Sequence, residues 1–153
     1  MKKVIAFILI AACLFSVACG GEKKLACTVD ELFEKICKVN AEGDMFANSA
    51  EWLADEYSIT ADLYTEGKFM IPEDSAGVET VAFFVAKNAE SAGIIKTLLD
   101  TIVASTRVDQ KDYNADNYQV ALDAVTKTEG VYVYLVMSPA KDAIIKIIED
   151  NLK

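Results

Sequence analysis

Histidine is absent from this chain, which also has only two prolines and a single tryptophan among its 153 residues. Without histidine, the chain lacks the side chain that most often serves as an acid–base catalyst and as a metal ligand near neutral pH. Basic side chains are also few, since 15 lysines and arginines stand against 24 aspartates and glutamates, and the net charge is −9. An excess of acidic residues argues against a nucleic-acid-binding protein, because binding to phosphate backbones depends on basic patches.

No apolar run reaches the roughly twenty residues that a membrane-spanning helix needs. The long apolar segment at residues 4–18 follows Lys2 and Lys3 and closes with the small residues of Ser16-Val17-Ala18-Cys19-Gly20. Basic, apolar and small-residue segments in this order are typical of a secretory signal peptide. We therefore expect residues 1–18 to be a cleaved signal and not a permanent anchor.

Cys19 directly follows the small residues, where bacterial lipoprotein precursors carry the cysteine that is acylated. Cys13 is a second candidate, but the apolar run before it is short, and cleavage there would leave an exposed apolar segment at the new N-terminus. Ordinary cleavage after Ala18, which would release a soluble protein, is the other alternative. We favour lipidation at Cys19, since each buried methylene adds about 0.8 kcal/mol and two or three chains anchor a protein firmly. This predicts a protein held by lipid at the outer face of the cytoplasmic membrane.

The remaining chain divides into a pliable tether at residues 19–26 and a single globular domain at residues 27–153. Thr28 and Glu31 form a capping-box pattern that starts a helix over residues 29–40. Ten helical steps, about 15 Å, separate Cys27 from Cys37, and a disulfide needs α-carbons within roughly 7 Å. We expect two free thiols, with Cys37 buried and Cys27 packed against the first turn of the helix.

Hydrophobic periodicity and turn residues predict the other elements. Helices are expected at residues 51–56, 88–108 and 116–122, and in the last segment after Ser138-Pro139. Strands are expected at residues 59–71, 78–87, 123–128 and 131–137, with a bulge at Gly67. Two helices followed by strand-strand-helix twice predict an α+β, two-layer domain: a four-stranded antiparallel sheet with two helices on one face.

Several segments together resemble a known family. They are the predicted lipid-bearing N-terminus, Asp30-Glu31-Leu32, Tyr57-Ser58-Ile59, the run from Val78 to Glu90, Asp112-Tyr113-Asn114 and Gly130-Val131-Tyr132-Val133. With these the mature chain resembles, over essentially its whole length, the bacterial lipoprotein family of domain of unknown function 4358. Ser58 stands where that family often has Gly, and Ala115 where Pro is frequent. The resemblance implies an exported, lipid-anchored domain of Gram-positive bacteria and carries no activity with it.

Asp112, Asn114 and Asp116 occupy the first, third and fifth positions of a calcium-loop pattern, and Asp123 the twelfth. Asn117 stands at the position that requires Gly, and Asn114 is better placed to cap the helix that follows. We expect no metal and no cofactor.

Four aromatic residues are expected on the sheet face away from the long helices: Tyr64, Phe84, Tyr132 and Tyr134. Aromatic residues are enriched at the centres of interfaces, so this face is a possible partner surface. The alternative is that the two N-terminal helices, with Phe33 and Trp52, fold over it.

Carboxylates are plentiful, but the spacing of Glu66, Asp74, Glu79 and Glu129 selects no catalytic pair. We therefore expect a non-enzymatic binding or interaction module whose partner is an envelope protein or a wall component. The alternative is an envelope enzyme or small-ligand carrier with clustered carboxylates in a cleft.

Overall fold

The structure, a computed structural model, describes residues 23–40 and 45–153, so the predicted signal and Cys19 lie outside it, as does Gly43, which we expect to end the first helix. The described helices are α1 (Val29–Val39), α2 (Ala50–Tyr57), α3 (Ala89–Gln110), α4 (Ala115–Leu122) and α5 (Lys141–Asn151). The strands are β1 (Met45–Ala47), β2 (Tyr64–Pro72), β3 (Thr80–Ala86), β4 (Val125–Glu129) and β5 (Tyr132–Met137).

The strands form one antiparallel sheet in the order β1-β2-β3-β5-β4. The predicted α+β class is confirmed, but the sheet has five strands and not four. The additional strand, β1, is three residues long and pairs with the end of β2, from Met45 opposite Pro72 to Ala47 opposite Met70. Three residues are too few to show an alternating pattern, which is why the sequence did not indicate it.

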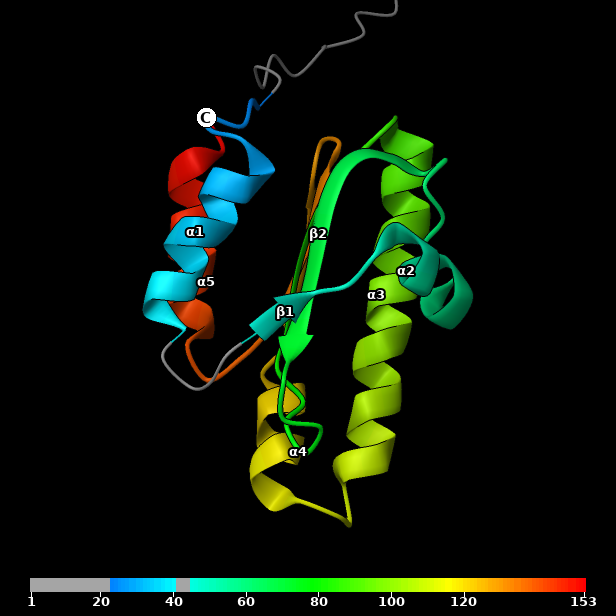
Figure 1. Ribbon diagram of the computed structural model, residues 1–153, viewed down its shortest axis with the longest axis vertical. Coiled ribbons are helices and arrows are strands. Elements are labelled where there is room, and N and C mark those ends of the chain that lie inside the picture. The colour runs from blue at the N-terminus through cyan, green and yellow to red at the C-terminus, as the bar shows by residue number, and fades with distance from the viewer. Residues whose placement is uncertain (1–22, 41–44) are drawn as a thin grey trace, which may run out of the picture.

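Helices cover both faces of the sheet, so the prediction that the two long helices share one face is wrong. Figure 1 shows α1 and α5 together on one side and α2 and α3 on the other. The cause lies in the central strands: every residue of β5 is buried, and in β3 all but Val85 are. A strand that is apolar on both faces needs a covering layer on each.

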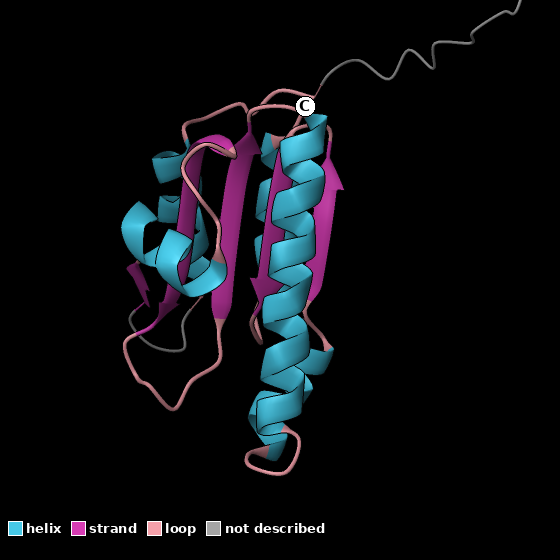
Figure 2. Cartoon of the chain, turned by 90° about the vertical axis from the view of Figure 1, so that its right-hand side faces the viewer, coloured by secondary structure: helices cyan, strands magenta, loops and turns pink. Residues whose placement is uncertain are grey.

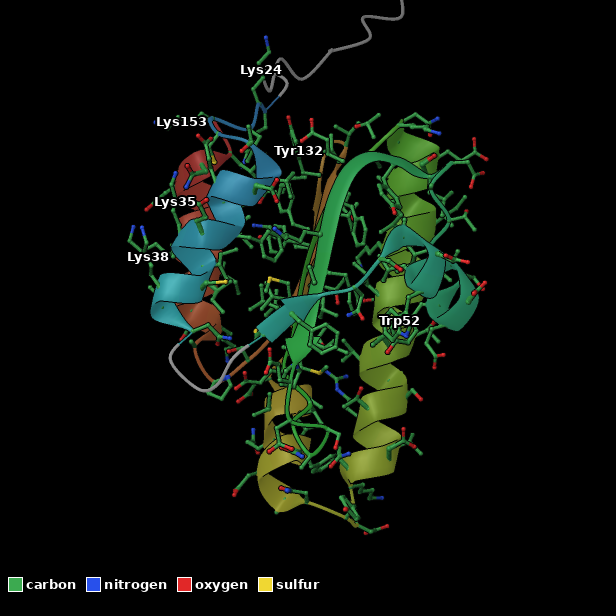
Figure 3. The ribbon with its side chains drawn as sticks, in the orientation of Figure 1. Lys24, Lys35, Lys38, Trp52, Tyr132 and Lys153 are labelled. Carbon is green, nitrogen blue, oxygen red and sulfur yellow. The ribbon has the colours of Figure 1, made fainter. Side chains whose placement is uncertain are left out.

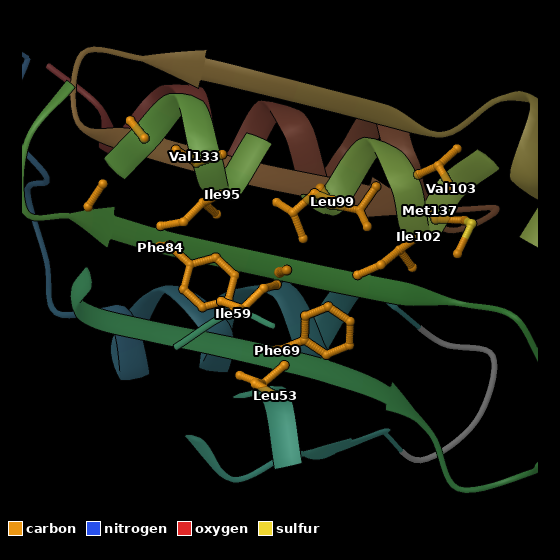
Figure 4. Packing of buried hydrophobic residues seen from close by; sticks show 14 of the residues in the cluster. Leu53, Ile59, Phe69, Phe84, Ile95, Leu99, Ile102, Val103, Val133 and Met137 are labelled. Carbon is orange, nitrogen blue, oxygen red and sulfur yellow. The ribbon is translucent and has the colours of Figure 1, made fainter. Parts of the chain in front are cut away.

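On the first face, α3 packs across β3, β4 and β5, as Figure 2 shows from that side. Figure 4 shows Ile95 and Leu99 of α3 directed at Phe84 of β3, with Ile59 and Phe69 alongside. On the second face, α1 and α5 contact each other and enclose a separate apolar cluster. Its members from these two helices and β5 include Phe33, Ile36, Tyr134, Ile144 and Ile148.

Side-chain caps fix several helix starts. The capping box of Thr28 and Glu31 is present at α1, and Asn88 and Asn114 accept amide hydrogen bonds at the starts of α3 and α4. Ser138-Pro139 was predicted to begin the last helix, but α5 begins at Lys141 without a side-chain cap. The Ser138 hydroxyl accepts the Ala140 amide at 3.1 Å, in the turn before α5, and donates to the side-chain oxygen of Asn40 at 2.9 Å, which joins the end of β5 to the end of α1.

Two local predictions need correction. The irregularity in β2 falls between Tyr64 and Glu66, while Gly67 pairs regularly with Phe84. Cys27 and Cys37 are free as predicted, but Cys37 is exposed because it lies outside the apolar stripe of α1, which runs through Leu32, Phe33 and Ile36.

The expected tether ends earlier than predicted. The amide of Lys24 donates to the carbonyl oxygen of Lys153 at 2.6 Å, the amide of Lys153 donates back at 3.0 Å, and Leu25 bridges Leu152. Residues 23–26 and 151–153 form what we call the terminal clamp. In the part of the chain that the structure describes, no helix has the length and apolar character to span a membrane.

Candidate functional site

The four aromatic residues predicted to form one surface lie on two different faces. Phe84 and Tyr64 pack against each other on the α3 side, with ring centroids 5.1 Å apart. Tyr132 and Tyr134 lie on the α1–α5 side beside Phe83. Strand register is the reason, since Tyr134 is directly opposite Phe83 and not Phe84, and opposed residues share a face.

These aromatic residues are covered by helices on both sides. Phe84 and Tyr134 are fully buried, Tyr132 is 9% exposed and Tyr64 is half-buried. Burial raises the pKa of both Tyr64 and Tyr134 above the ordinary value. The alternative placed both N-terminal helices over one face. Instead, α1 covers one face with Phe33, and α2 lies on the other face, where the ring centroid of Trp52 is 6.2 Å from that of Phe69. The four therefore do not form a common exposed patch.

A cleft lies at the opposite end of the molecule from the terminal clamp. It consists of two adjoining hollows of about 250 and 430 Å³, and both are lined by Pro72, Asp74, Gly77, Val78 and Glu79. In Figure 1 the loop after β2 lies at this end, between α4 and the end of α3. The walls of the cleft therefore come from the loop after β2, from α4 and from the end of α3, which are separate segments of the sequence.

Hydrogen bonds hold the β2–β3 loop in place. The Asp74 carboxylate accepts the Ala76 amide at 2.9 Å, and the Gly77 amide donates to the Asp74 carbonyl oxygen at 3.0 Å. The side-chain amide of Asn117, in the first turn of α4, donates to the Ala76 carbonyl oxygen at 2.8 Å. This loop is rich in turn-forming residues, yet α4 ties it down and gives the cleft a defined wall.

The charged side chains of the lining are all acidic. Glu73, Asp74, Glu79, Asp109 and Asp116 line the two hollows, and neither lining includes a lysine or an arginine. Glu79 lines both hollows and is only 8% exposed. Within the described ranges, Glu73, Asp74, Asp109 and Asp116 form no ion pair. These four carboxylates therefore give the cleft negative charge that no ion pair among the described residues compensates.

Apolar groups complete the walls. The first hollow is lined by Ile71, Val78 and Ile102, and the second by Val120 and Pro139. Pockets that hold small organic ligands commonly combine apolar walls with a few polar groups and enclose about 300–1,000 Å³. The arrangement suits an organic cation with an apolar body.

Of the four carboxylates considered from the sequence, the structure brings only Asp74 and Glu79 together. Glu66 lies near the other end of β2, and Glu129 forms ion pairs with Lys23 and Lys127. These two lysines lower the pKa of Glu129, Lys127 contributing most. The sequence did not single out Asp109, because it stands in a polar stretch without a motif. Asp109 lies at the end of α3, which meets the β2–β3 loop only in the folded structure.

Asn114, a candidate calcium ligand, uses its side-chain oxygen to accept the amides of Asp116 and Asn117 at 3.0 Å each. Its role as the cap of α4 is confirmed. Across residues 23–40 and 45–153, no group of three or more acidic, cysteine or histidine side chains is arranged to hold a metal ion.

Comparison with known proteins gives one result. The family model of a domain of unknown function, DUF4358, matches residues 38–138. The chain belongs to the DUF4358 family. No curated protein and no solved structure matches it.

The DUF4358 match is narrower than the resemblance suggested, since Asp30-Glu31-Leu32 lies before it. It covers all five strands with α2, α3 and α4, and it excludes α5 and nearly all of α1. Every residue of the two hollows except Pro139 falls inside it. In this DUF4358 protein, the cleft thus belongs to the part shared with the family, and the terminal clamp does not.

Proposed function

We propose that this chain is a lipid-anchored extracytoplasmic binding module, held at the outer face of the cytoplasmic membrane through Cys19, whose cleft takes a basic segment of an envelope protein. The observation that carries the binding proposal is the cleft, with five carboxylates and no basic side chain in its lining. The observation behind the anchoring is the signal-like order of residues 1–21 with Cys19 at its end.

A basic peptide fits this lining better than a bare ion or a neutral ligand. Its lysine or arginine heads would meet Asp74, Asp109 and Glu79, while the methylene stems would lie along Ile71, Val78 and Val120. The described residues offer no metal-binding group there. The chain has no histidine to act as a general base, so the proposal is for binding without catalysis.

The binding test titrates the mature chain with a fluorescent peptide of alternating lysine and leucine, and with the same peptide acetylated at every lysine. The Asp74→Asn/Asp109→Asn variant should bind the basic peptide about tenfold more weakly, since an exposed ion pair contributes up to about 1 kcal/mol and 1.4 kcal/mol is about a factor of ten.

The matched control is Glu34→Gln/Glu66→Gln, which removes the same charge from exposed positions outside the two hollows. An equal loss in both variants would attribute binding to net charge and refute a cleft site. Equal affinity for the acetylated peptide would refute the cationic ligand. Free arginine methyl ester binding as tightly as the peptide would instead favour a small-ligand carrier.

The anchoring test is separate. The full-length chain, expressed in a bacterium, should partition with membranes and show an intact mass with acyl chains on residues 19–153, and Cys19→Ser should abolish both. An unacylated, soluble mature product from the unsubstituted chain would refute lipidation.

A further inference from the structure

We infer that the domain stands upright on the membrane, with the terminal clamp facing the lipid headgroups and the acid-lined cleft facing away. The inference rests on the proposed attachment through Cys19, and it assigns the surface around the clamp as the side that contacts the bilayer.

The first step is the position of the clamp. Lys24 and Lys153 exchange backbone hydrogen bonds, the Ala26 amide donates to the Asn151 carbonyl oxygen at 2.8 Å, and the Leu25 amide donates to the Tyr132 hydroxyl at 3.1 Å. Figure 3 shows Lys24, Lys153 and Tyr132 at one end of the long axis, with Trp52 well down it. The chain therefore enters the fold at one end and is fixed there.

The second step is the reach of the anchor. Four residue steps separate Cys19 from Lys23, the first described residue, and a fully extended chain covers at most about 3.6 Å per residue. The acylated residue is thus within about 14 Å of the clamp. The clamp end must stay close to the headgroups.

The third step is the distance to the cleft. The start of α3 lies at the clamp end, because β3 runs into it and the Ala86 amide donates to the Val131 carbonyl oxygen in the turn between β4 and β5. Its other end, at Asp109 and Gln110, lines the cleft. A helix of 22 residues is about 33 Å long, more than twice the reach of the anchor.

The fourth step is charge, which favours the upright position over a domain lying on its side. Two carboxylates at the clamp end, Glu129 and Glu149, are in ion pairs with Lys23 and Lys127. Glu31, Glu66 and Glu90 at that end have no ion pair among the described residues, but the lysines Lys24 and Lys153 stand there as well. At the cleft end, Glu73, Asp74, Asp109 and Asp116 have no such partner among the described residues. Anionic headgroups therefore repel the cleft end more strongly, within the screening length of about 10 Å at 0.1 M salt.

The test uses the lipidated full chain, purified from bacterial membranes and reconstituted in vesicles of phosphatidylcholine and phosphatidylglycerol that carry a nitroxide headgroup quencher. Single fluorophores are attached to Lys87→Cys at the clamp end and to Tyr113→Cys, an 81% exposed residue after α3, in a chain with Cys27 and Cys37 replaced by Ser. The label at position 87 should lose most of its emission, and the label at 113 should keep most of it.

Two flank labels separate an upright domain from one lying on its side. Cys37 of α1, restored alone, and Thr97→Cys of α3 are exposed and stand at matching distances along helices on opposite faces of the sheet. Equal, intermediate quenching at both supports the upright position. Strong quenching at one flank, or quenching at 113 that equals that at 87, overturns the inference.

Flotation of the vesicles distinguishes the two proposals. A chain that does not float with the vesicles refutes the anchoring and the orientation together. A chain that floats but is quenched equally at all four positions refutes the orientation alone.

Discussion

The ring of Phe84 lies directly against the α-carbon of Gly67, its partner on the neighbouring strand. A β-carbon built on Gly67 would lie 2.3 Å from Cδ1 of that ring, far inside contact distance. Because Phe84 is fully buried under α3 and packs against Tyr64, its ring has little room to move away. A glycine in the middle of β2 is thus required by packing and not by backbone conformation.

We predict that Gly67→Ala lowers the free energy of unfolding by about 2 kcal/mol, since added volume in a packed site costs about 1–3 kcal/mol. Urea unfolding measures this. The control is Gly93→Ala in α3, where a β-carbon would meet nothing within 4 Å and the substitution should stabilise by up to about 1 kcal/mol. Equal effects at both positions would contradict the packing explanation.

Ser58 ends α2 in a left-handed conformation, with φ 58°, and it is the only described residue other than glycine with positive φ. Its position matches the Gly that the family resemblance leads us to expect. We predict that Ser58→Gly raises the free energy of unfolding by about 0.5 kcal/mol, because strain relief outweighs the added freedom of the unfolded chain.

The comparison for Ser58→Gly is Ser49→Gly at the other end of α2. Ser49 has φ −72° and its hydroxyl accepts the Trp52 amide. Ser49→Gly should lower the free energy of unfolding by roughly a few tenths of a kcal/mol. A loss of stability on Ser58→Gly would contradict the prediction and show that the left-handed conformation of Ser58 carries little strain.

Ala115 is the first residue of α4, where an amide has no acceptor within its own helix. The preceding Asn114 is extended, with φ −146° and ψ 111°, as a residue before proline should be. We predict that Ala115→Pro raises the thermal midpoint, with a gain of about 0.5–1 kcal/mol. Tyr118→Pro removes the bond from the Tyr118 amide to the Asn114 carbonyl oxygen and should cost about 3 kcal/mol.

Glu129 ties the N-terminal segment to the β4–β5 hairpin through Lys23 and Lys127, and the two lysines lower its pKa below the ordinary value of 4.5. A lowered pKa means that Glu129 stabilises the fold above about pH 4.5 and that this contribution is lost as the pH falls through the folded-state pKa. We predict that Glu129→Gln lowers the free energy of unfolding by about 1 kcal/mol at pH 7 and that the difference disappears once the pH has fallen below the folded-state pKa of Glu129.

Unfolding curves of both proteins from pH 7 to pH 3 measure this. Glu66→Gln, which removes an exposed carboxylate without an ion pair among the described residues, is the control and should show no such pH dependence. A constant difference between Glu129→Gln and the unsubstituted protein at every pH would contradict the assignment to the ionised carboxylate.

Most of the elements could be predicted because their signals are local. The cap at Thr28, the long apolar stripe of α3 and the turn at Gly130 each act within a few residues. The side of the sheet that α5 covers is not local. It depends on which strand residues are opposed. Both faces of β3 are apolar and need a covering layer, yet the sequence prediction placed the two long helices on one face.

The cleft could be predicted only in fragments. The β2–β3 loop was recognisable by its turn residues, and the start of α4 by Asn114. Their meeting depends on the length of α3, which carries Asp109 back past the whole sheet to the end where Asn117 fastens Ala76. Contacts between segments so far apart in the sequence follow from the packed fold, and the spacing of residues along the chain does not predict them.

The reciprocal bonds between Lys24 and Lys153 have a practical consequence for reporter design. A fluorescent protein fused after Lys153 would emerge beside the N-terminal segment and opposite the cleft, so it would crowd the proposed anchor and leave the entrance of the cleft open. A reporter inserted in the loop at Tyr113, where the side chain is largely in solvent, would do the reverse.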